Sequence, residues 1–251
     1  MKKSANNLRQ SAANVEAVAF DGYGTLINFT EPDFIVTMAE VCDQQGLQAD
    51  AADVWRRFLR AAYLLRAENH HEPVYRRYDE AWAIQFERVF KSARGGRLAG
   101  DARAAANHLK ARLANAPAFA EAHAVIEALR PHYRLALLSN ADDDFLLECL
   151  QRNGLHFDTV VTSERARAIK PNPEIFLGLA RTMALPPHQI LYVGDNPIPD
   201  VLGPVRAGMR AAWLNRAGLR KPRQVPQPDF RLRSLAELLP LLAPEGSRLG
   251  P

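Results

Sequence analysis

The stretch Val15-Glu-Ala-Val-Ala-Phe-Asp-Gly-Tyr-Gly-Thr-Leu-Ile27 decides the fold of this chain. Its first part is a short apolar run, which stops at Asp21 and passes into a turn flanked by Gly22 and Gly24. A buried central strand of a parallel sheet has this pattern when it carries a carboxylate at its C-terminal end. Ligands of open parallel sheets bind beyond those ends, so Asp21 is a candidate for a reaction centre. A turn acid that only caps the following segment is the structural alternative.

The composition is that of an ordinary globular protein. The chain has 251 residues, of which 47% are hydrophobic and 24% charged, so we expect one large domain or a domain with a substantial insertion. Its net charge is only +4, and no stripe of Lys and Arg interleaved with aromatic residues is present, so we expect no nucleic-acid partner. The length fixes no assembly state, and a monomer and a homodimer both stay open.

The cysteines and the lengths of the apolar segments indicate the cellular compartment in which we expect the protein. Cys42 and Cys149 lie far apart and have no C-x-x-C pattern, which predicts buried thiols in a reducing environment. No run approaches the roughly 18 apolar residues of a membrane span, and residues 1–14 lack the apolar stretch of a signal peptide. We therefore expect a cytoplasmic protein without a membrane partner.

The region 32–115 has a helical character throughout. Its apolar residues recur at helical spacing, Gly46, Pro73 and Gly95-Gly96 fall where helix boundaries are wanted, and no convincing strand interrupts it. This predicts a helical subdomain inserted directly after the first strand. The predicted domains are an α/β core over 15–31 and 116–245 and a helical cap over 32–115, with tails at 1–14 and 246–251.

Strands and helices alternate in the rest of the chain. Strands are predicted over 133–140, 157–162, 189–195 and 210–214, with a short edge piece at 229–233. Helices are predicted over 118–130, 144–153, 173–183, 200–207 and 234–242. Alternation at this spacing indicates parallel βαβ units with right-handed crossovers, and hence a doubly wound α/β sheet.

Polar residues gather at the ends of the predicted strands. They are Asp21 with Thr25, Ser139 with Asn140, Asp195 with Asn196 and Asp200, and Lys170 in the loop after the third strand. Taken singly, each is explained by a strand-end turn, a helix cap or a solvated lysine. If the strands are neighbours, however, all of them meet at one edge of the sheet.

This set of groups suits phosphoryl transfer. Carboxylates from two strands, Asp21 and Asp195, offer the hard oxygen ligands that Mg²⁺ prefers. Lys170 and the small hydroxyl and amide donors would neutralise and hold the remaining phosphate oxygens. Asp21 is the best-placed nucleophile for an aspartyl-phosphate that water later hydrolyses.

Four motifs carry a family resemblance. Asp-Gly-Tyr-Gly-Thr-Leu, Leu-Leu-Ser-Asn, Lys-Pro-Asn-Pro-Glu-Ile-Phe and Val-Gly-Asp-Asn-Pro-Ile-Pro-Asp resemble, in the right order, the motifs of the haloacid dehalogenase-like (HAD) hydrolase superfamily. The insertion after the first motif resembles the C1-type cap of that superfamily. The resemblance implies that Asp21 is the nucleophile and that Ser139 and Lys170 bind the transferred group.

The resemblance also implies a magnesium site. Asp195, Asp21 and the backbone carbonyl of Tyr23 would be the protein ligands, with Asp200 supporting them. We add Asn196 to the supporting groups, and we expect Thr25, Asn140 and the Tyr23 side chain to contact a small anionic, phosphorylated substrate.

Tyr23 departs from the phosphatase pattern. Phosphatases of this family usually carry a second aspartate at that position, which protonates the leaving alcohol and then activates water. A tyrosine with an ordinary pKa near 10 is a poor base at neutral pH. Tyrosine there resembles the 2-haloacid dehalogenase branch, in which the aspartate attacks carbon, halide leaves without a proton and no metal is used.

The fourth motif argues for the phosphatase. It keeps Asp195 and Asp200 at phosphatase spacing, whereas the dehalogenases lack the first acid, and Phe176 stands where those enzymes place a tyrosine. A second carboxylate without a metal would raise the pKa of Asp21 and weaken it as a nucleophile. We therefore favour magnesium-dependent phosphoryl chemistry, with metal-free dehalogenation and a catalytically weak, phosphometabolite-binding protein as alternatives.

The cap is expected to close over the site and to select the substrate. Candidates for recognising an anion are Arg60, Arg66, Arg76, Arg77 and Lys91, but we expect most of them to form a solvated helix face. We expect no metal at His70-His71 and Glu72, because adjacent histidines cannot both face one ion without further ligands. Trp82, Phe86 and Phe90 are expected to form the core of the cap.

Overall fold

The computed structural model describes residues 14–68, 75–91 and 100–243. They form two compact units. One contains the residues up to Asn28, Ala118–Asn140 and those from Leu155 onward; the other contains Phe29–Pro117 and Ala141–Gly154. The predicted tails, and the predictions for His70, His71, Glu72, Pro73 and Gly95-Gly96, lie outside the described residues.

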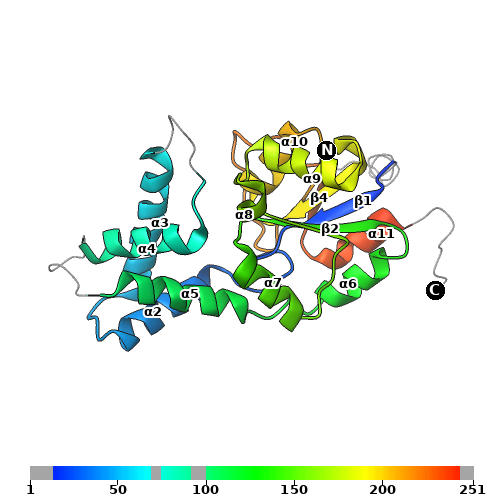
Figure 1. Cartoon of the computed structure of the whole chain (residues 1–251). Helices are drawn as coiled ribbons and strands as arrows, with labels where there is room; N and C mark the ends of the chain where they lie inside the picture. Colours follow the sequence, from blue (N-terminus) through cyan, green and yellow to red (C-terminus); the bar gives the residue numbers. More distant parts are fainter. Residues whose placement is uncertain (1–13, 69–74, 92–99, 244–251) are drawn as a thin grey trace. The chain divides into compact units, whose positions relative to one another are not determined.

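The first unit is built on a six-stranded, all-parallel sheet (Figure 1). Its order is β3-β2-β1-β4-β5-β6. The strands are β1 (Ala17–Phe20), β2 (Arg134–Ser139), β3 (Thr159–Thr162), β4 (Ile190–Gly194), β5 (Arg210–Leu214) and β6 (Phe230–Leu232). The predicted doubly wound α/β sheet is confirmed, and the strand from the opening stretch occupies its centre.

Helices cover this sheet. They are α6 (Ala122–Leu129), α8 (Ser163–Ala166), α9 (Pro173–Met183), α10 (Gly203–Arg206) and α11 (Leu238–Leu242), with 3₁₀ turns at Pro187–Gln189 and Leu235–Glu237. Figure 1 shows α9 and α10 on one face of the sheet and α6 and α11 on the other. On the α9 face, Ile175 and Phe176 pack against Ala19, Leu138 and Tyr192, and all of these residues are buried.

Alternation along the central strand explains the two layers. Ala17 and Ala19 face the α9 layer, and small residues there let the helix approach closely. The intervening residues Val18 and Phe20 are also completely buried. A strand covered on both faces has an almost continuous apolar sequence, as this one does.

Four details of the prediction were wrong. The helix expected from residue 118 begins at Ala122, because Phe119 N–H donates to Leu26 O at 2.8 Å and holds this segment extended beside the β1 loop. The helix expected over 200–207 is a π-helical turn (Ile198–Leu202) followed by α10. The helix expected over 234–242 is a 3₁₀ turn followed by α11, and α8 was not predicted.

The second unit is helical in the described residues. Its helices are α2 (Glu31–Gln44), α3 (Ala51–Glu68), α4 (Tyr78–Lys91), α5 (Ala102–Ala114) and α7 (Asp143–Arg152). Side chains define two of the starts: Thr30 N–H donates to Asp33 at 2.8 Å before α2, and Asp101 accepts from two backbone amides before α5. The helical character predicted for 32–115 is confirmed here, whereas α7, which we had placed in the α/β core, groups with this unit.

Aromatic rings form the centre of the second unit. Phe34 stacks on Trp55 with ring centroids 4.6 Å apart, and Phe58 contacts Phe86 at 4.8 Å. Phe86, Phe90 and Trp82 are buried, as expected for core residues. Cys42 and Cys149 are buried free thiols, as predicted. No helix among the described residues has the length and apolar character needed to cross a membrane.

Candidate active site

Three neighbouring strands deliver the candidate residues to one edge of the sheet. β1 lies between β2 and β4, with Phe20 in register with Leu137 and Val193. Asp21 follows β1 directly, Ser139 is the last residue of β2, and Asp195 follows β4. Because all three strands are parallel, their carboxyl ends coincide, and these side chains converge as the sequence predicted.

Asp21 lies at the centre of the cluster. Its Oδ1 accepts hydrogen bonds from Ser139 Oγ at 3.0 Å and from Lys170 Nζ at 2.8 Å. Among the described residues, no donor reaches its Oδ2. The side chain is 11% exposed, so a small ligand can reach this carboxylate although most of its surface is covered.

Lys170 joins the two ends of the cluster. Its buried ammonium lies 2.8 Å from Asp21 Oδ1 and 2.7 Å from Asp200 Oδ1, and it donates to the Tyr192 hydroxyl at 2.8 Å. Burial lowers the pKa of Lys170, but the carboxylates of Asp200 and Asp21 more than offset this effect and raise it well above its usual value. Lys170 therefore stays charged across the whole neutral range.

Asn140 holds the Lys170 segment in place. Its Oδ1 accepts from Lys170 N at 2.8 Å, and its Nδ2 donates to Lys170 O at 3.2 Å. The oxygen and the nitrogen of the Asn140 amide thus both bond the backbone of Lys170, whose side chain contacts Asp21. We predicted that Asn140 contacts substrate; in this structure its amide positions Lys170.

Asp200 belongs to the π-helical turn Ile198–Leu202 and shares the Lys170 ammonium with Asp21. It is completely buried; its Oδ1 faces Lys170 and its Oδ2 accepts from Asn196 N–H at 2.9 Å. A Cβ at Gly194 would lie 2.4 Å from Asp200 Cγ, so only glycine fits at the end of β4. Burial raises the pKa of Asp200 to about 6 although Lys170 opposes the shift. The contribution of Asn196 comes from its backbone amide.

Asp195 is the least compensated acid of the cluster. Within the described part of the chain its carboxylate accepts one hydrogen bond, from Thr25 Oγ1 at 3.2 Å. Burial, followed by the nearby charges of Asp200 and Asp21, raises the pKa of Asp195 to about 7. Gly24, at a φ of +85°, lies against this carboxylate, and a Cβ there would be 2.7 Å from Asp195 Oδ2.

These groups fit a divalent cation. Asp21, Asp195 and Asp200 each offer an oxygen, and the three oxygens lie within 4.8 Å of one another. Three carboxylates face one ammonium, so a small dication would balance the charge, and an all-oxygen donor set suits Mg²⁺. The role of the Tyr23 backbone carbonyl as a further ligand stays a prediction.

Three further residues support the site and were not predicted. Tyr192 donates to Leu138 O at 2.7 Å while it accepts from Lys170, and Trp213 Nε1 donates to Asp195 O at 2.8 Å. Arg216 bonds both the Glu121 carboxylate and Thr25 O. A tyrosine inside the apolar run Ile190–Gly194 was the available signal, because a buried hydroxyl needs a partner.

The cap cations predicted for anion recognition differ in their surroundings. Arg77 lies 3.1 Å from Asp144, and Lys91 lies 3.4 Å from Glu87, so both have acidic neighbours. Arg66 is exposed. Arg60 lines a hollow together with three other arginines.

A search against family models matches residues 15–208 to the haloacid dehalogenase-like hydrolases. The chain belongs to this hydrolase family. The match spans the cluster around Asp21 and the four predicted motifs, so the family predicted from those motifs is confirmed.

Curated relatives of this HAD hydrolase include both chemistries. Phosphoserine phosphatase of Thermus thermophilus is 37% identical over 164 residues, which are 63% of this chain and 66% of the relative. Haloacetate dehalogenase H-2 of Moraxella sp. is 27% identical over 235 residues, covering 91% of this chain and 98% of the relative. The phosphatase is thus more similar locally, whereas the dehalogenase is matched over nearly its whole length.

Solved structures show the same fold. Magnesium-bound HAD-hydrolase YfnB from Bacillus subtilis superposes with a TM-score of 0.75 at 20% identity, covering 91% of this chain and 99% of that one. The L-2-haloacid dehalogenase RSc1362 gives a TM-score of 0.74 at 23% identity, covering 91% and 98%. These comparisons establish a HAD hydrolase, and the type of bond that it cleaves is a separate question.

Proposed function

We propose that this HAD hydrolase is a magnesium-dependent phosphatase that acts on a small phosphorylated metabolite through an aspartyl-phosphate. One observation carries the proposal: the Asp195 carboxylate lies in one cluster with Asp21 and Asp200. A metal-free reaction at Asp21 gains nothing from this further, partly buried acid, whose charge would only repel that of Asp21. A metal-dependent reaction needs it as a ligand.

The first step forms a bond from Asp21 to phosphorus. Both hydrogen bonds to Asp21 go to Oδ1, so Oδ2 is the oxygen that attacks. As the Oδ2–P bond forms, the ester P–O bond breaks and its electron pair leaves with the alcohol oxygen. Ser139 and Lys170 stand at Oδ1, where they orient the nucleophile and face the charge that develops on the phosphoryl oxygens.

The second step restores Asp21. A water oxygen attacks phosphorus, the acyl–phosphate bond breaks with its electrons returning to the carboxylate, and inorganic phosphate is released. A bound magnesium ion would supply positive charge to the phosphate oxygens throughout. Asp21 and Asp195 would hold this ion, together with the backbone carbonyl of Tyr23 and with Asp200 behind them.

The leaving group sets the substrate preference. Tyr23 occupies the position at which family phosphatases carry their acid–base aspartate, so the departing oxygen has a poor proton donor. Acyl and aryl phosphates need little protonation and should therefore be turned over faster than alkyl phosphates. In this scheme Thr25 and Asn140 act indirectly. Thr25 donates a hydrogen bond to Asp195, and Asn140 holds the backbone of Lys170 in place.

Dehalogenation is the second candidate, and Tyr23 is the observation that favours it. In that reaction Asp21 would attack C2 of a haloacid, halide would leave with the carbon–halogen electron pair, and water would hydrolyse the ester. The Moraxella relative is a haloacetate dehalogenase. Asp195 has no function in this scheme. A third candidate, a protein that binds a phosphometabolite with negligible turnover, also follows from the lost acid at Tyr23.

Product release separates the three candidates. Phosphate release is measured from a panel of alkyl, aryl and acyl phosphates with Mg²⁺ and again with EDTA, and halide release is measured from 2-haloacids. The proposal predicts phosphate release that EDTA abolishes. Halide release without phosphate release supports dehalogenation, and the absence of both products supports the binding protein. Asp21→Asn is the control for all arms, because it removes the nucleophile but little packing.

A further inference from the structure

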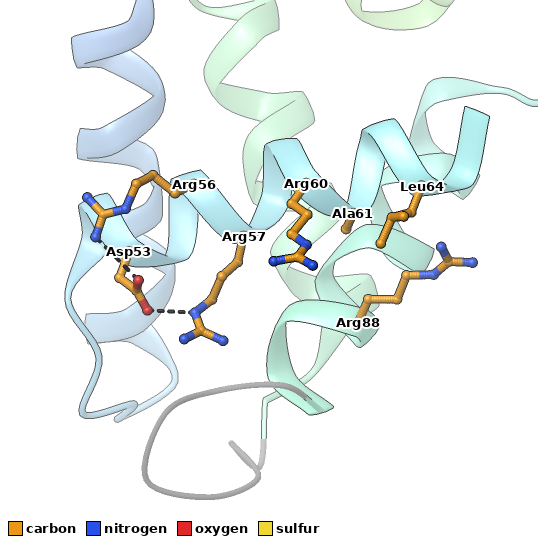
Figure 2. Close-up of a pocket in the computed structure, with 7 residues that line it drawn as sticks. All are labelled: Asp53, Arg56, Arg57, Arg60, Ala61, Leu64 and Arg88. Carbon is orange, nitrogen blue, oxygen red and sulfur yellow. Dashed lines mark hydrogen bonds and ion pairs between the residues drawn. The ribbon is translucent and has the colours of Figure 1, made fainter. Parts of the chain in front are cut away.

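A hollow with a strongly basic lining lies in the helical second unit (Figure 2). Its volume is ≈ 550 Å³, which is within the range of small-molecule sites. Residues of α3 and α4 line it, namely Asp53, Arg56, Arg57, Arg60, Ala61, Leu64 and Arg88. None of them belongs to the carboxylate cluster at Asp21.

The charge of the lining is unbalanced. The lining contains four arginines and one acid, Asp53, and the Asp53 carboxylate pairs with Arg57 at 2.6 Å and with Arg56 at 3.3 Å. Within the described residues, Arg60 has no ion-pair partner. An anion bound in the hollow would therefore meet no competing carboxylate at Arg60 among the described residues.

The packing of two helices builds this lining. Residues 53, 56, 57, 60, 61 and 64 recur at helical spacing on one face of α3, whereas Arg88 comes from α4. The buried rings of Phe58 and Phe86, whose centroids are 4.8 Å apart, pack these two helices together. Figure 2 shows Arg57 and Arg60 projecting from α3 toward the side on which α4 carries Arg88. The lining therefore draws on two helices, α3 and α4, whereas an ordinary solvated face would involve α3 alone.

We infer that this arginine-lined hollow binds a small organic phosphate, at a site separate from the carboxylate cluster. The planar fork of a guanidinium pairs with two phosphate oxygens at once, so several arginines together select a multiply charged phosphate group. Ala61 and the exposed side chain of Leu64 add apolar surface for the organic part of the ligand. The inference does not depend on the phosphatase proposal.

Titration calorimetry with inorganic pyrophosphate and with ADP tests the site. The full chain is used at low salt and in EDTA, where the negative carboxylate cluster repels phosphates. Arg57→Gln/Arg60→Gln removes two of the guanidinium groups. Arg66→Gln/Arg103→Gln removes the same charge from exposed arginines outside the lining and is the matched control. Arg60→Gln alone breaks no ion pair in the described structure and serves if the double variant misfolds.

The expected result is saturable binding that weakens about tenfold for each lining arginine removed, because a charge-assisted hydrogen bond contributes about that factor. ADP should bind more tightly than pyrophosphate if the apolar surface takes part in the way proposed. The control variant should bind as the wild type does. Absence of saturable binding to the wild type would overturn the inference. So would equal losses in the lining and control variants, since these would indicate a non-specific charge effect.

Discussion

The Lys170 ammonium lies 2.8 Å from Asp21 Oδ1, and both side chains are nearly withdrawn from solvent, with exposed fractions of 2% and 11%. The same ammonium lies 2.7 Å from Asp200, so one buried cation bridges two buried acids. In this geometry Lys170 determines both the charge balance of the site and the orientation of Asp21.

Removal of this cation should destabilise the fold. Lys170→Met leaves the Asp21 and Asp200 carboxylates buried without their counter-charge, and breaking a buried pair in this way costs about 3–5 kcal/mol. Urea denaturation in EDTA measures the loss. Lys91→Met is the matched control, because Lys91 is 59% exposed and its ion pair within the described residues is with the surface residue Glu87, at 3.4 Å. Equal stability of the two variants would show that Lys170 does not compensate the acids.

Asp195 should make the metal-free protein less stable at high pH. Its pKa is about 7 in the folded state against 3.8 in the unfolded chain, so the folded state binds more protons between these values. Stability therefore falls as the pH rises through this window, and the full penalty is present above pH 7.

Asp195→Asn tests this directly. In EDTA at pH 8 the variant should be more stable than the wild type by up to a few kcal/mol, whereas at pH 4 the two should agree. Adding Mg²⁺ should stabilise the wild type at pH 8 and leave the variant unchanged. Asp43→Asn, at an exposed position in α2, controls for the loss of one negative charge. A variant that is less stable than the wild type at pH 8 would contradict the account.

Tyr23→Asp should restore the missing proton donor. General acid–base catalysis contributes roughly 10²–10⁴-fold, so turnover of alkyl phosphates should rise by up to this factor. Acyl phosphates, whose leaving groups need little protonation, should change much less. The ratio of kcat/KM values for the two classes is the readout. A uniform change across both classes would show that Tyr23 does not limit protonation of the leaving group.

Asp142 should be essential to the second unit. This completely buried carboxylate, at the start of α7, accepts from Tyr75 OH at 2.9 Å and from the backbone amides of Tyr78 at 2.7 Å and Asp79 at 3.3 Å. Asp142→Ala leaves three partly buried donors without this acceptor and should destabilise by about 2–4 kcal/mol. Thermal unfolding beside Asp43→Ala measures the effect, and a variant as stable as this control would rule out the anchoring role.

Much of the fold could be predicted from the sequence, because the local sequence patterns agree with the way the elements pack. Ala17–Phe20 is buried throughout, as is the strand at 210–214 after Arg210, and neither has a competing pattern. The helix α9 begins at Pro173 and ends at Met183, as predicted. The errors arose where tertiary contacts override local preference. Phe119 bonds to Leu26 O instead of extending α6, a contact between segments far apart in the sequence that no local pattern reveals.

The candidate site shows the same division. Strand ends identified Asp21, Ser139 and Asp195, because parallel topology alone places them together. Other contacts depend on loop conformation and burial. They are the hydrogen bonds between the Asn140 amide and the Lys170 backbone, and the hydrogen bond from the Lys170 ammonium to the Tyr192 hydroxyl. Spacing carries no information about these contacts. The hydrogen bonds between Asp142 and residues 75–79 could not be predicted from the sequence for the same reason.

The central claim is that Asp195 serves phosphoryl transfer. Its most direct test compares phosphate release from acetyl phosphate by the wild type and by Asp195→Asn, each with Mg²⁺ and with EDTA, and halide release from 2-chloropropionate in the same samples. The account predicts phosphate release by the wild type with Mg²⁺ only, and a loss in the variant larger than the roughly 10–100-fold typical of groups behind a metal site. Halide release that persists in EDTA and survives Asp195→Asn, without phosphate release, would contradict it.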